Sequence, residues 1–370
     1  MNKLINLIKS NPVVIIAFIA ATVTCFFIPP DAEYLAYFDL STLSCLFCTL
    51  AVISALKNIA FFRTLAQKII SIFHNLRSAI LALVFITYIG SMIIANDMAL
   101  LTFLPLGFYT LDKTGNRRYM AFTFTMQTLA ANLGGMLTPF GNPQNLYLYS
   151  HFGISDADFF KTMSLPFGVS FVLIVTCCLF VKKLPLTLQC PQDYGTSKTK
   201  TATYLALFAI CIVAVFRIIP YWSALIVVLA VLMLMDRKAL LEVDYPLLLT
   251  FCAFFVFSGN MSRIPTVREL VESLAGQNTL LFSTLSCQAI SNVPTAVLLS
   301  RFNVDVHQLL VGVNIGGVGT IISSLASLIT FREYNKQDHK NIKKYILLFS
   351  AFNFGFLLIL YICSYFMFNA

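Results

Sequence analysis

The chain has 370 residues, of which 58% are hydrophobic and 11% are charged, and its formal net charge is +9. Soluble domains carry about 25% charged residues, so this composition excludes a water-soluble globular protein and predicts a multi-pass membrane protein in the lipid bilayer. The positive charge does not indicate a nucleic-acid partner, because the basic residues lie in short loops, where the positive-inside rule places them. The sequence contains no nucleotide-binding loop, hydrolase elbow or Cys/His metal cluster. An ATP-driven pump and a membrane enzyme are therefore disfavoured, and no cofactor is expected.

The first predicted element is an apolar span at residues 13–28, which follows a short basic region. It resembles a signal peptide, but apolar segments continue through the rest of the chain, so we expect an uncleaved span that starts in the cytoplasm. A second span is predicted at residues 40–56. Residues 79–111 are flanked by basic residues on both sides, which places both of their ends in the cytoplasm.

That third segment is too short for two crossings, which need about 40 residues. Its polar pair, Asn96 and Asp97, lies at its middle, where a full crossing would expose the pair to hydrocarbon. Irregular backbone at this depth is tolerated only when it is buried in protein. We therefore predict a re-entrant hairpin that enters from the cytoplasm and carries these two residues at its tip.

The remaining apolar segments are 119–149 (interrupted), 163–181, 204–219, 223–235, 246–258, 279–300, 309–330 (interrupted) and 346–367. The basic loops at residues 237–238 and 332–344 are both expected inside, so one of the three segments between them must return to its starting side. Residues 279–300 contain Asn292 followed by Pro294, and proline stops a helix. This segment is predicted to be a second hairpin, entering from outside; the short segment 246–258 is the alternative.

The resulting fold class is an all-α membrane protein with inverted repeats, two re-entrant hairpins and two unwound transmembrane helices. It has nine crossings, with the N-terminus inside and the C-terminus outside the cytoplasmic (inner) membrane. Residues 1–198 form the first inverted repeat, with the hairpin 79–111 and the unwound helix 119–149. Residues 199–370 form a linking span and the second repeat, with the hairpin 279–300 and the unwound helix 309–330.

A repeated motif supports this division. Residues 132–138 read NLGGMLT and residues 314–320 read NIGGVGT, each downstream of an Asn in an apolar segment. Paired Gly-rich breaks in membrane helices are typical of secondary transporters with internal repeats. Unwinding exposes carbonyl groups that can coordinate a cation, and half-helix N-termini that attract an anion. The alternative is a kinked helix whose polar groups satisfy one another.

The expected site residues lie at the hairpin tips and the two breaks. Expected substrate-binding residues are Asn96, Asp97, Thr138, Pro139, Asn142, Asn145, Ser291, Asn292, Thr295, Asn314 and Thr320. A coupling cation is expected at Asn96, Asp97, Gly141, Asn292 and Gly319; no metal is expected beyond a transported Na⁺. An ionisable residue inside a membrane is a functional candidate, so Asp97 is expected to be a cation ligand or a proton carrier. The alternative is that Asp97 is a solvated helix cap at the cytoplasmic edge.

Four segments, ANDMALLTFLPL, ANLGGMLTPFGNPQN, SNVPTAVLL and VNIGGVGTIISSLASL, resemble the ion transporter superfamily. This group contains divalent anion/sodium symporters, citrate transporters, arsenite permeases and sodium/proton antiporters. Each hairpin tip of the dicarboxylate symporters reads Ser-Asn-Thr. Asn96 and Asn292 match the central Asn and Ser291 matches a Ser, whereas Ala95, Asp97 and Val293 replace the other tip residues. Residues 141–145 are similar to the first unwound motif of that family, Gly-Thr-Pro-Pro-Asn.

The resemblance implies a homodimer that works by an elevator motion. The predicted function is secondary active transport of a small anion, an organic acid or an inorganic oxyanion, coupled to Na⁺ or H⁺. The alternative is a Na⁺/H⁺ antiporter or an arsenite-type permease of the same fold, with Asp97 as the exchange site.

Overall fold

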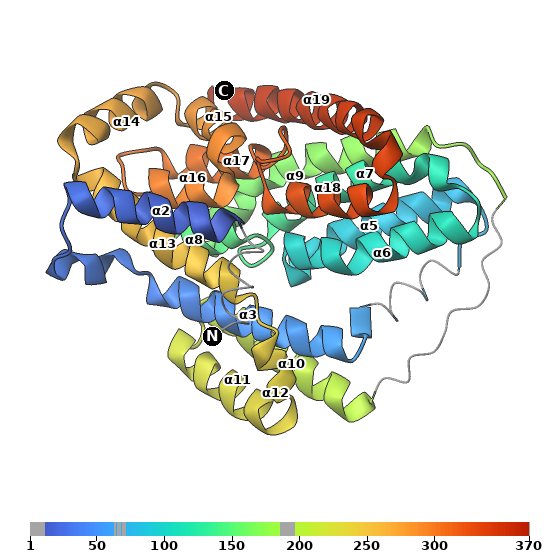
Figure 1. The fold of residues 1–370 in the computed structure, drawn as a ribbon, viewed down its shortest axis with the longest axis horizontal. Helices are drawn as coiled ribbons and strands as arrows, with labels where there is room; N and C mark the ends of the chain where they lie inside the picture. The colour runs from blue at the N-terminus through green and yellow to red at the C-terminus, as the bar shows by residue number, and fades with distance from the viewer. Residues whose placement is uncertain (1–11, 63, 65–67, 69–71, 186–196, 370) are drawn as a thin grey trace.

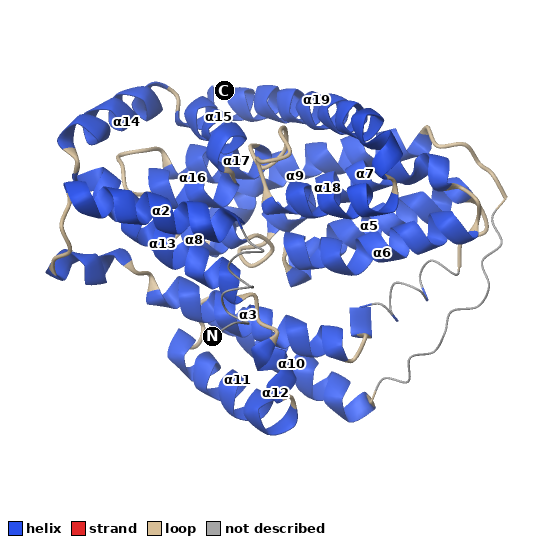
Figure 2. Ribbon diagram, in the orientation of Figure 1, coloured by secondary structure: helices blue, strands red, loops and turns tan. Residues whose placement is uncertain are grey.

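The computed structural model describes residues 12–62, 64, 68, 72–185 and 197–369 (Figure 1). Within these ranges the secondary structure consists of α-helices and short 3-10 helices, without a β-strand (Figure 2). Six of the described helices are long and apolar enough to cross a membrane: Leu40–Asn58, Leu76–Ile94, Asp156–Leu179, Lys198–Val215, Tyr245–Arg263 and His339–Asn369. The predicted all-helical, multi-pass membrane protein is confirmed.

One group of helices surrounds α3 (Leu40–Asn58), which packs against α10 (Lys198–Val215), α11 (Tyr221–Met235) and the short α12 (Arg237–Leu241) (Figure 1). Next to this group, α2 (Pro12–Phe27) packs along α13 (Tyr245–Arg263). Many of the outward side chains are apolar and exposed, for example Phe26 and Leu234. Exposed apolar residues on the apolar helices of a membrane protein indicate surfaces that face lipid.

Two helical hairpins form the second group, and a single residue separates the arms of each. Ala95 joins α5 (Leu76–Ile94) to α6 (Asn96–Lys113), and Ser291 joins α15 (Thr279–Ile290) to α16 (Asn292–Leu299). The second hairpin ends one residue short of the predicted segment 279–300. The first extends beyond the predicted 79–111, because Asn75 accepts a hydrogen bond from the backbone N–H of Ser78 and so starts the helix earlier.

Both predicted helix interruptions are present. In the first, α7 (Met120–Gly134) continues into the 3-10 turn η3 (Gly135–Leu137), and the chain becomes helical again in α8 (Pro143–His151). Pro143 takes the first helical position of α8, where proline needs no hydrogen-bond partner. In the second, α17 (Val306–Ile315) and α18 (Leu325–Gln337) are separated by residues 316–324.

The two interrupted helices contact each other in a crosswise manner. The helix before the first break, α7, contacts α18, which follows the second break, while α8 contacts α17. Each hairpin packs along the first half of its own interrupted helix, α5 on α7 and α15 on α17. The second arm of each hairpin contacts the second half of the other interrupted helix: α6 lies beside α18, and α16 lies beside α8. Two long helices, α9 (Asp156–Leu179) and α19 (Ile342–Asn369), pack against α7, and α14 (Pro265–Gln277) connects α13 to the second hairpin.

Candidate functional site

The two hairpin tips have nearly the same backbone conformation. Ala95 has φ 63° and ψ 148°, and Ser291 has φ 73° and ψ 159°. Residues other than glycine rarely adopt this region, and holding one there costs on the order of 1–3 kcal/mol, so the surrounding contacts must enforce it. Each tip residue directs the following Asn, Asn96 or Asn292, into the neighbouring break.

Both tip asparagines use their backbone in the same way. The N–H of Asn96 donates to the carbonyl of Gly141 at 3.0 Å, and the N–H of Asn292 donates to the carbonyl of Ser323 at 2.9 Å. In each case the side-chain Oδ1 accepts from the next backbone N–H, at 2.9 Å. Both asparagines are only 3% exposed. Each hairpin tip is therefore attached to the break of its own interrupted helix.

The repeated motif makes matching contacts in its two copies. The Thr138 hydroxyl donates to the carbonyl of Met92 at 2.7 Å, and the Thr320 hydroxyl donates to the carbonyl of Gln288 at 3.1 Å. Both acceptors lie three residues before the tip of their hairpin. A Cβ at Gly134 would lie 2.6 Å from Ser91 Oγ, and one at Gly316 would lie 2.9 Å from Cys287 Sγ. Ser91 and Cys287 both lie four residues before the tip, so the motif glycines allow the hairpin arm to approach closely.

A network of asparagine side chains joins the first break to the second. Asn314 Oδ1 accepts from Asn142 Nδ2 at 3.1 Å, and Asn314 Nδ2 donates to Asn145 Oδ1 at 2.6 Å. Asn132 Nδ2 donates to Ser324 Oγ at 3.1 Å, and Asn132 Oδ1 accepts from Asn96 Nδ2 at 3.1 Å. We call Asn132, Asn142, Asn145 and Asn314 the asparagine network. Most of its polar atoms have protein partners, as in a kinked helix whose polar groups satisfy one another.

Three buried acceptor oxygens near the first break have no hydrogen-bond partner among the described residues: Asp97 Oδ1, Asn142 Oδ1 and Gln144 Oε1. A buried acceptor without a donor costs about 1–3 kcal/mol, so such groups call for an explanation. Asp97 lies in the first turn of α6 and is 9% exposed, so it is buried and not a solvated cap. A bound cation can satisfy a carboxylate or an amide oxygen, whereas a proton can satisfy only the carboxylate of Asp97.

Of the other expected site residues, Thr295 and Ser291 have hydroxyl groups that are close to protein carbonyls. The Thr295 hydroxyl donates to the carbonyl of Ser291 at 2.7 Å, and the Ser291 hydroxyl lies 3.3 Å from the carbonyl of Ser323. Gly319 has φ 128°. Pro139 lies between η3 and α8, within the first break, and is buried.

Gln288 was not predicted as a site residue, although it organises the second break. Its Nε2 donates to the carbonyls of Gly316 and Val318 at 2.8 and 3.1 Å, and its Oε1 accepts from the N–H of Thr320 at 2.9 Å. The sequence signal that could have identified Gln288 is a side-chain amide within the apolar arm TLLFSTLSCQAI, about one helical turn before the hairpin tip. An amide at that depth must find polar partners.

Comparison with known proteins finds similarity to membrane transporters. The citrate transporter family (CitMHS) matches residues 4–312, which is most of the chain. An uncharacterized transporter, MJ0456 of Methanocaldococcus jannaschii, is 31% identical over 80% of this chain and 81% of that protein. The inner membrane protein YbiR of Escherichia coli K12 is 29% identical over 84% of both chains. The silicon efflux transporter LSI3 of Oryza sativa subsp. japonica is 27% identical over 47% of this chain and 36% of that protein.

One conclusion follows from the long apolar helices, from the two hairpins joined to two helix breaks, and from the family match over most of the chain. The chain belongs to the citrate transporter family, and it is a multi-pass membrane transporter.

Proposed function

We propose that this protein is a secondary active transporter that moves a small anion, an organic acid or an inorganic oxyanion, in a cycle coupled to Na⁺ or H⁺. The substrate lies between the two hairpin tips and the two helix breaks. The observation that carries this proposal is that the same attachment occurs twice, with Asn96 bonded to one break and Asn292 bonded to the other.

The polarity of the helix ends supports an anion together with a cation. Four helices begin at this centre, namely α6, α8, α16 and α18, and four end there, namely α5, α7, α15 and α17. Helix N-termini carry a partial positive charge and free N–H groups that favour an anion, whereas C-termini expose carbonyls that favour a cation. Since both kinds of helix end meet at one place, the site suits an anion that travels with a coupling cation.

The expected topology is part of the proposal. We infer that residues 1–198 and 199–370 contain two inverted repeats, with the first hairpin opening to the cytoplasm and the second to the outside of the inner membrane. The crosswise contacts between α7 and α18 and between α8 and α17 support this arrangement. A homodimer, in which the hairpins and interrupted helices slide as an elevator against α3 and its neighbours, completes the proposal.

A second function rests on Asp97. This carboxylate is buried near the first tip, and its Oδ1 has no hydrogen-bond partner among the described residues. In a sodium/proton antiporter the same group would exchange the two cations, and no anion would be needed. Buried ionisable groups inside membranes commonly carry protons or ions, which makes this the main competitor.

The test is transport by purified protein in liposomes. Citrate and silicic acid, chosen from the family and one relative, and arsenite, chosen from the resemblance in the sequence, are first screened by thermal shift. Uptake of any stabilising compound is then measured with an imposed Na⁺ or proton gradient. Asn96→Ala and Asn292→Ala are each expected to lower uptake at least tenfold, because each removes a tip amide.

The matched control is Asn353→Ala, since Asn353 is a fully buried asparagine of α19 that donates to the carbonyl of Phe349. It is expected to keep wild-type uptake. If either tip variant transports at the wild-type rate while remaining folded, that tip does not line the substrate site. Cation flux without any anion requirement would favour the antiporter.

A further inference from the structure

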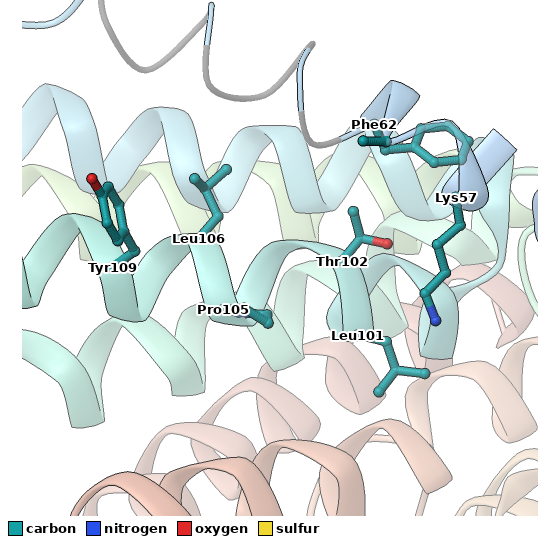
Figure 3. A pocket seen from close by; sticks show the side chains of 8 residues that line it. Lys57, Phe62, Leu101, Thr102, Pro105, Leu106 and Tyr109 are labelled. Atoms are coloured by element: carbon teal, nitrogen blue, oxygen red, sulfur yellow. The ribbon is translucent and has the colours of Figure 1, made fainter. Parts of the chain in front are cut away.

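One boundary separates two parts of the molecule. The scaffold consists of α2, α3, α10 to α13 and the 3-10 turn η1 (Ala32–Tyr37); the mobile unit consists of the hairpins, the interrupted helices, α9 and α19. Across the boundary, α3 contacts α8 and α13 contacts α16. A cavity of about 320 Å³ separates the end of α3 from α6 (Figure 3). Lys57, in the last turn of α3, lies there beside Leu101 (Figure 3).

The level of Lys57 shows how the two parts are displaced. A lysine at the end of a membrane helix holds its charge at the headgroup level. Beyond Leu101, α6 continues to Lys113, about 18 Å further at a rise of about 1.5 Å per residue. Figure 1 likewise shows α5 and α6 extending past the end of α3. In the proposed topology this end is cytoplasmic, so the mobile unit is displaced toward the cytoplasm.

An arginine crosses the boundary at the opposite end of α3. Arg301, two residues after α16, donates to the backbone carbonyl of Tyr37, and its guanidinium lies 5.9 Å from the centroid of the Tyr37 ring. The Tyr37 hydroxyl donates to Asn260 Oδ1 at 3.2 Å and accepts from Arg263 Nη1 at 2.9 Å, both in α13. Tyr37 is thus fixed to the scaffold, and Arg301 joins the second hairpin to it.

Arg217 makes the reciprocal contact from the scaffold. Its guanidinium donates to the backbone carbonyl of Tyr149 in α8 and lies 4.2 Å from the centroid of that ring. Tyr149 lies in the last turn of α8, where carbonyls lack partners within the helix. The hydroxyls of Tyr147 and Ser300 are 2.7 Å apart, which links α8 to the end of the second hairpin. Both arginines therefore hold the same part of the mobile unit.

The backbone at Arg217 is strained, with φ 61°. Its N–H donates to the carbonyl of Ala214 at 3.0 Å, and the N–H of Ile218 donates to the carbonyl of Val213 at 3.1 Å. This pattern ends a helix with a left-handed residue, which is usually glycine. An arginine in that place adds strain that its backbone role does not explain, whereas the contact of its side chain with Tyr149 does.

We propose that the contacts of Arg301 with Tyr37 and of Arg217 with Tyr149 are two latches that hold the mobile unit at the cytoplasmic end of its travel. This inference rests on the proposed elevator motion. Tyr37 and Tyr149 are both buried. When the mobile unit moves outward along α3, both carbonyls lose a charged donor, so the latches favour the state in which the first hairpin extends beyond the scaffold.

The experiment measures a distance across the boundary by double electron–electron resonance, on the cysteine-free full-length protein in liposomes. Spin labels are placed at Lys113→Cys in α6 and Lys238→Cys in α12, which are both exposed. Wild type is expected to show one main distance. Arg301→Gln and Arg217→Gln should each shift the ratio of the two states about tenfold toward a shorter distance, and the double variant about a hundredfold. The distance shortens because Lys113 moves back toward the end of α3.

The matched control is Arg77→Gln. Arg77 also donates to a backbone carbonyl, that of Val181 at 2.6 Å, but both residues belong to the mobile unit, so the distances should not change. Arg217→Gly removes the side chain and also relieves the backbone strain, so it should shift the distances as Arg217→Gln does without lowering the melting temperature.

A wild-type distance distribution in the double variant, or an equal shift in Arg77→Gln, would overturn the latches. The distance measurement needs no substrate, so its outcome is separate from that of the proposed function. Failure of wild type to take up any anion tested would count against the proposed function, and a shift in the double variant would still support the latches.

Discussion

Gly141 provides the sharpest test of the first helix break. A Cβ at this position would lie 2.3 Å from the carbonyl oxygen of Gly135 and 2.7 Å from Thr138 Oγ1. The nearest of these atoms is backbone, so it cannot rotate away as the end of a side chain would. The carbonyl of Gly141 also accepts the hydrogen bond from the tip residue Asn96. Gly141→Ala is therefore expected to move both the break and the hairpin tip that is attached to it.

The size of the effect follows from the clash. Overpacking costs about 1–3 kcal/mol, and contact with backbone places this case at the upper end. With an unfolding entropy of about 2.1 cal/mol/K per residue, a loss of about 3 kcal/mol in a chain of this length lowers the melting temperature by about 4 °C. Transport should fall much further, because the tip loses its position relative to the break.

The matched control is Gly168→Ala, because a Cβ at Gly168 in α9 meets no atom within 4 Å. Replacing glycine by alanine inside a helix contributes up to about 1 kcal/mol, so the melting temperature should stay the same or rise. Both variants are measured by differential scanning fluorimetry and by uptake in liposomes. A Gly141→Ala protein with wild-type melting temperature and uptake would refute the close approach of Gly135 and Gly141. Equal losses in both variants would show that the clash is not the cause.

Three further predictions concern charge and topology. Asp97→Asn is expected to keep substrate binding but to flatten the dependence of uptake on pH or Na⁺. The control is Asp112→Asn, at the far end of the same helix, which should leave that dependence intact. An unchanged profile in Asp97→Asn would place coupling elsewhere. Arg263 donates to the Asp31 carboxylate and holds the pKa of that loop residue below its usual value of 3.8. The stability that this pair contributes is therefore present above that value and is lost as pH falls through the lowered pKa. Asp31→Asn should show a slightly lower melting temperature at neutral pH and a smaller decrease in melting temperature on acidification. In a cysteine-free background, Lys113→Cys should react with an impermeant thiol reagent only from the cytoplasm and Asn303→Cys only from outside; labelling of both from one side would contradict inverted repeats.

Local features of the sequence were sufficient to predict the main elements. Flanking charge and a central polar pair predicted the first hairpin, and Pro294 after an asparagine predicted the second, which matches within one residue at its end. Gly and Pro predicted the first break and Gly alone predicted the second, because these residues cannot continue a helix without cost. The start of the first hairpin was missed, since it depends on the Asn75 cap, and Asn75 lies outside the apolar run that marked the segment.

The partners of the polar residues could not be predicted in this way. Asn142 and Asn314 are 172 residues apart in the chain, and no local pattern specifies which distant amide meets which. The sequence assigned Asn142, Asn145 and Asn314 to substrate but did not predict that their amide nitrogens donate to protein groups, while Asn142 Oδ1 has no partner among the described residues. The role of Gln288 was missed for the same reason, because its acceptors belong to the second break.

The asparagine network bears on how such a transporter could move. Its hydrogen bonds connect the first break to the second, and each break holds the tip of one hairpin, so both hairpins and both interrupted helices are tied to one polar centre. Separating these parts would leave several buried amides without partners, at about 1–3 kcal/mol for each. Displacing the whole centre relative to α3 would break none of these bonds. The cavity between α3 and α6 lies at that boundary. We therefore infer that motion by displacement of an intact unit costs less than opening of the centre itself, which is the physical basis for the elevator proposal.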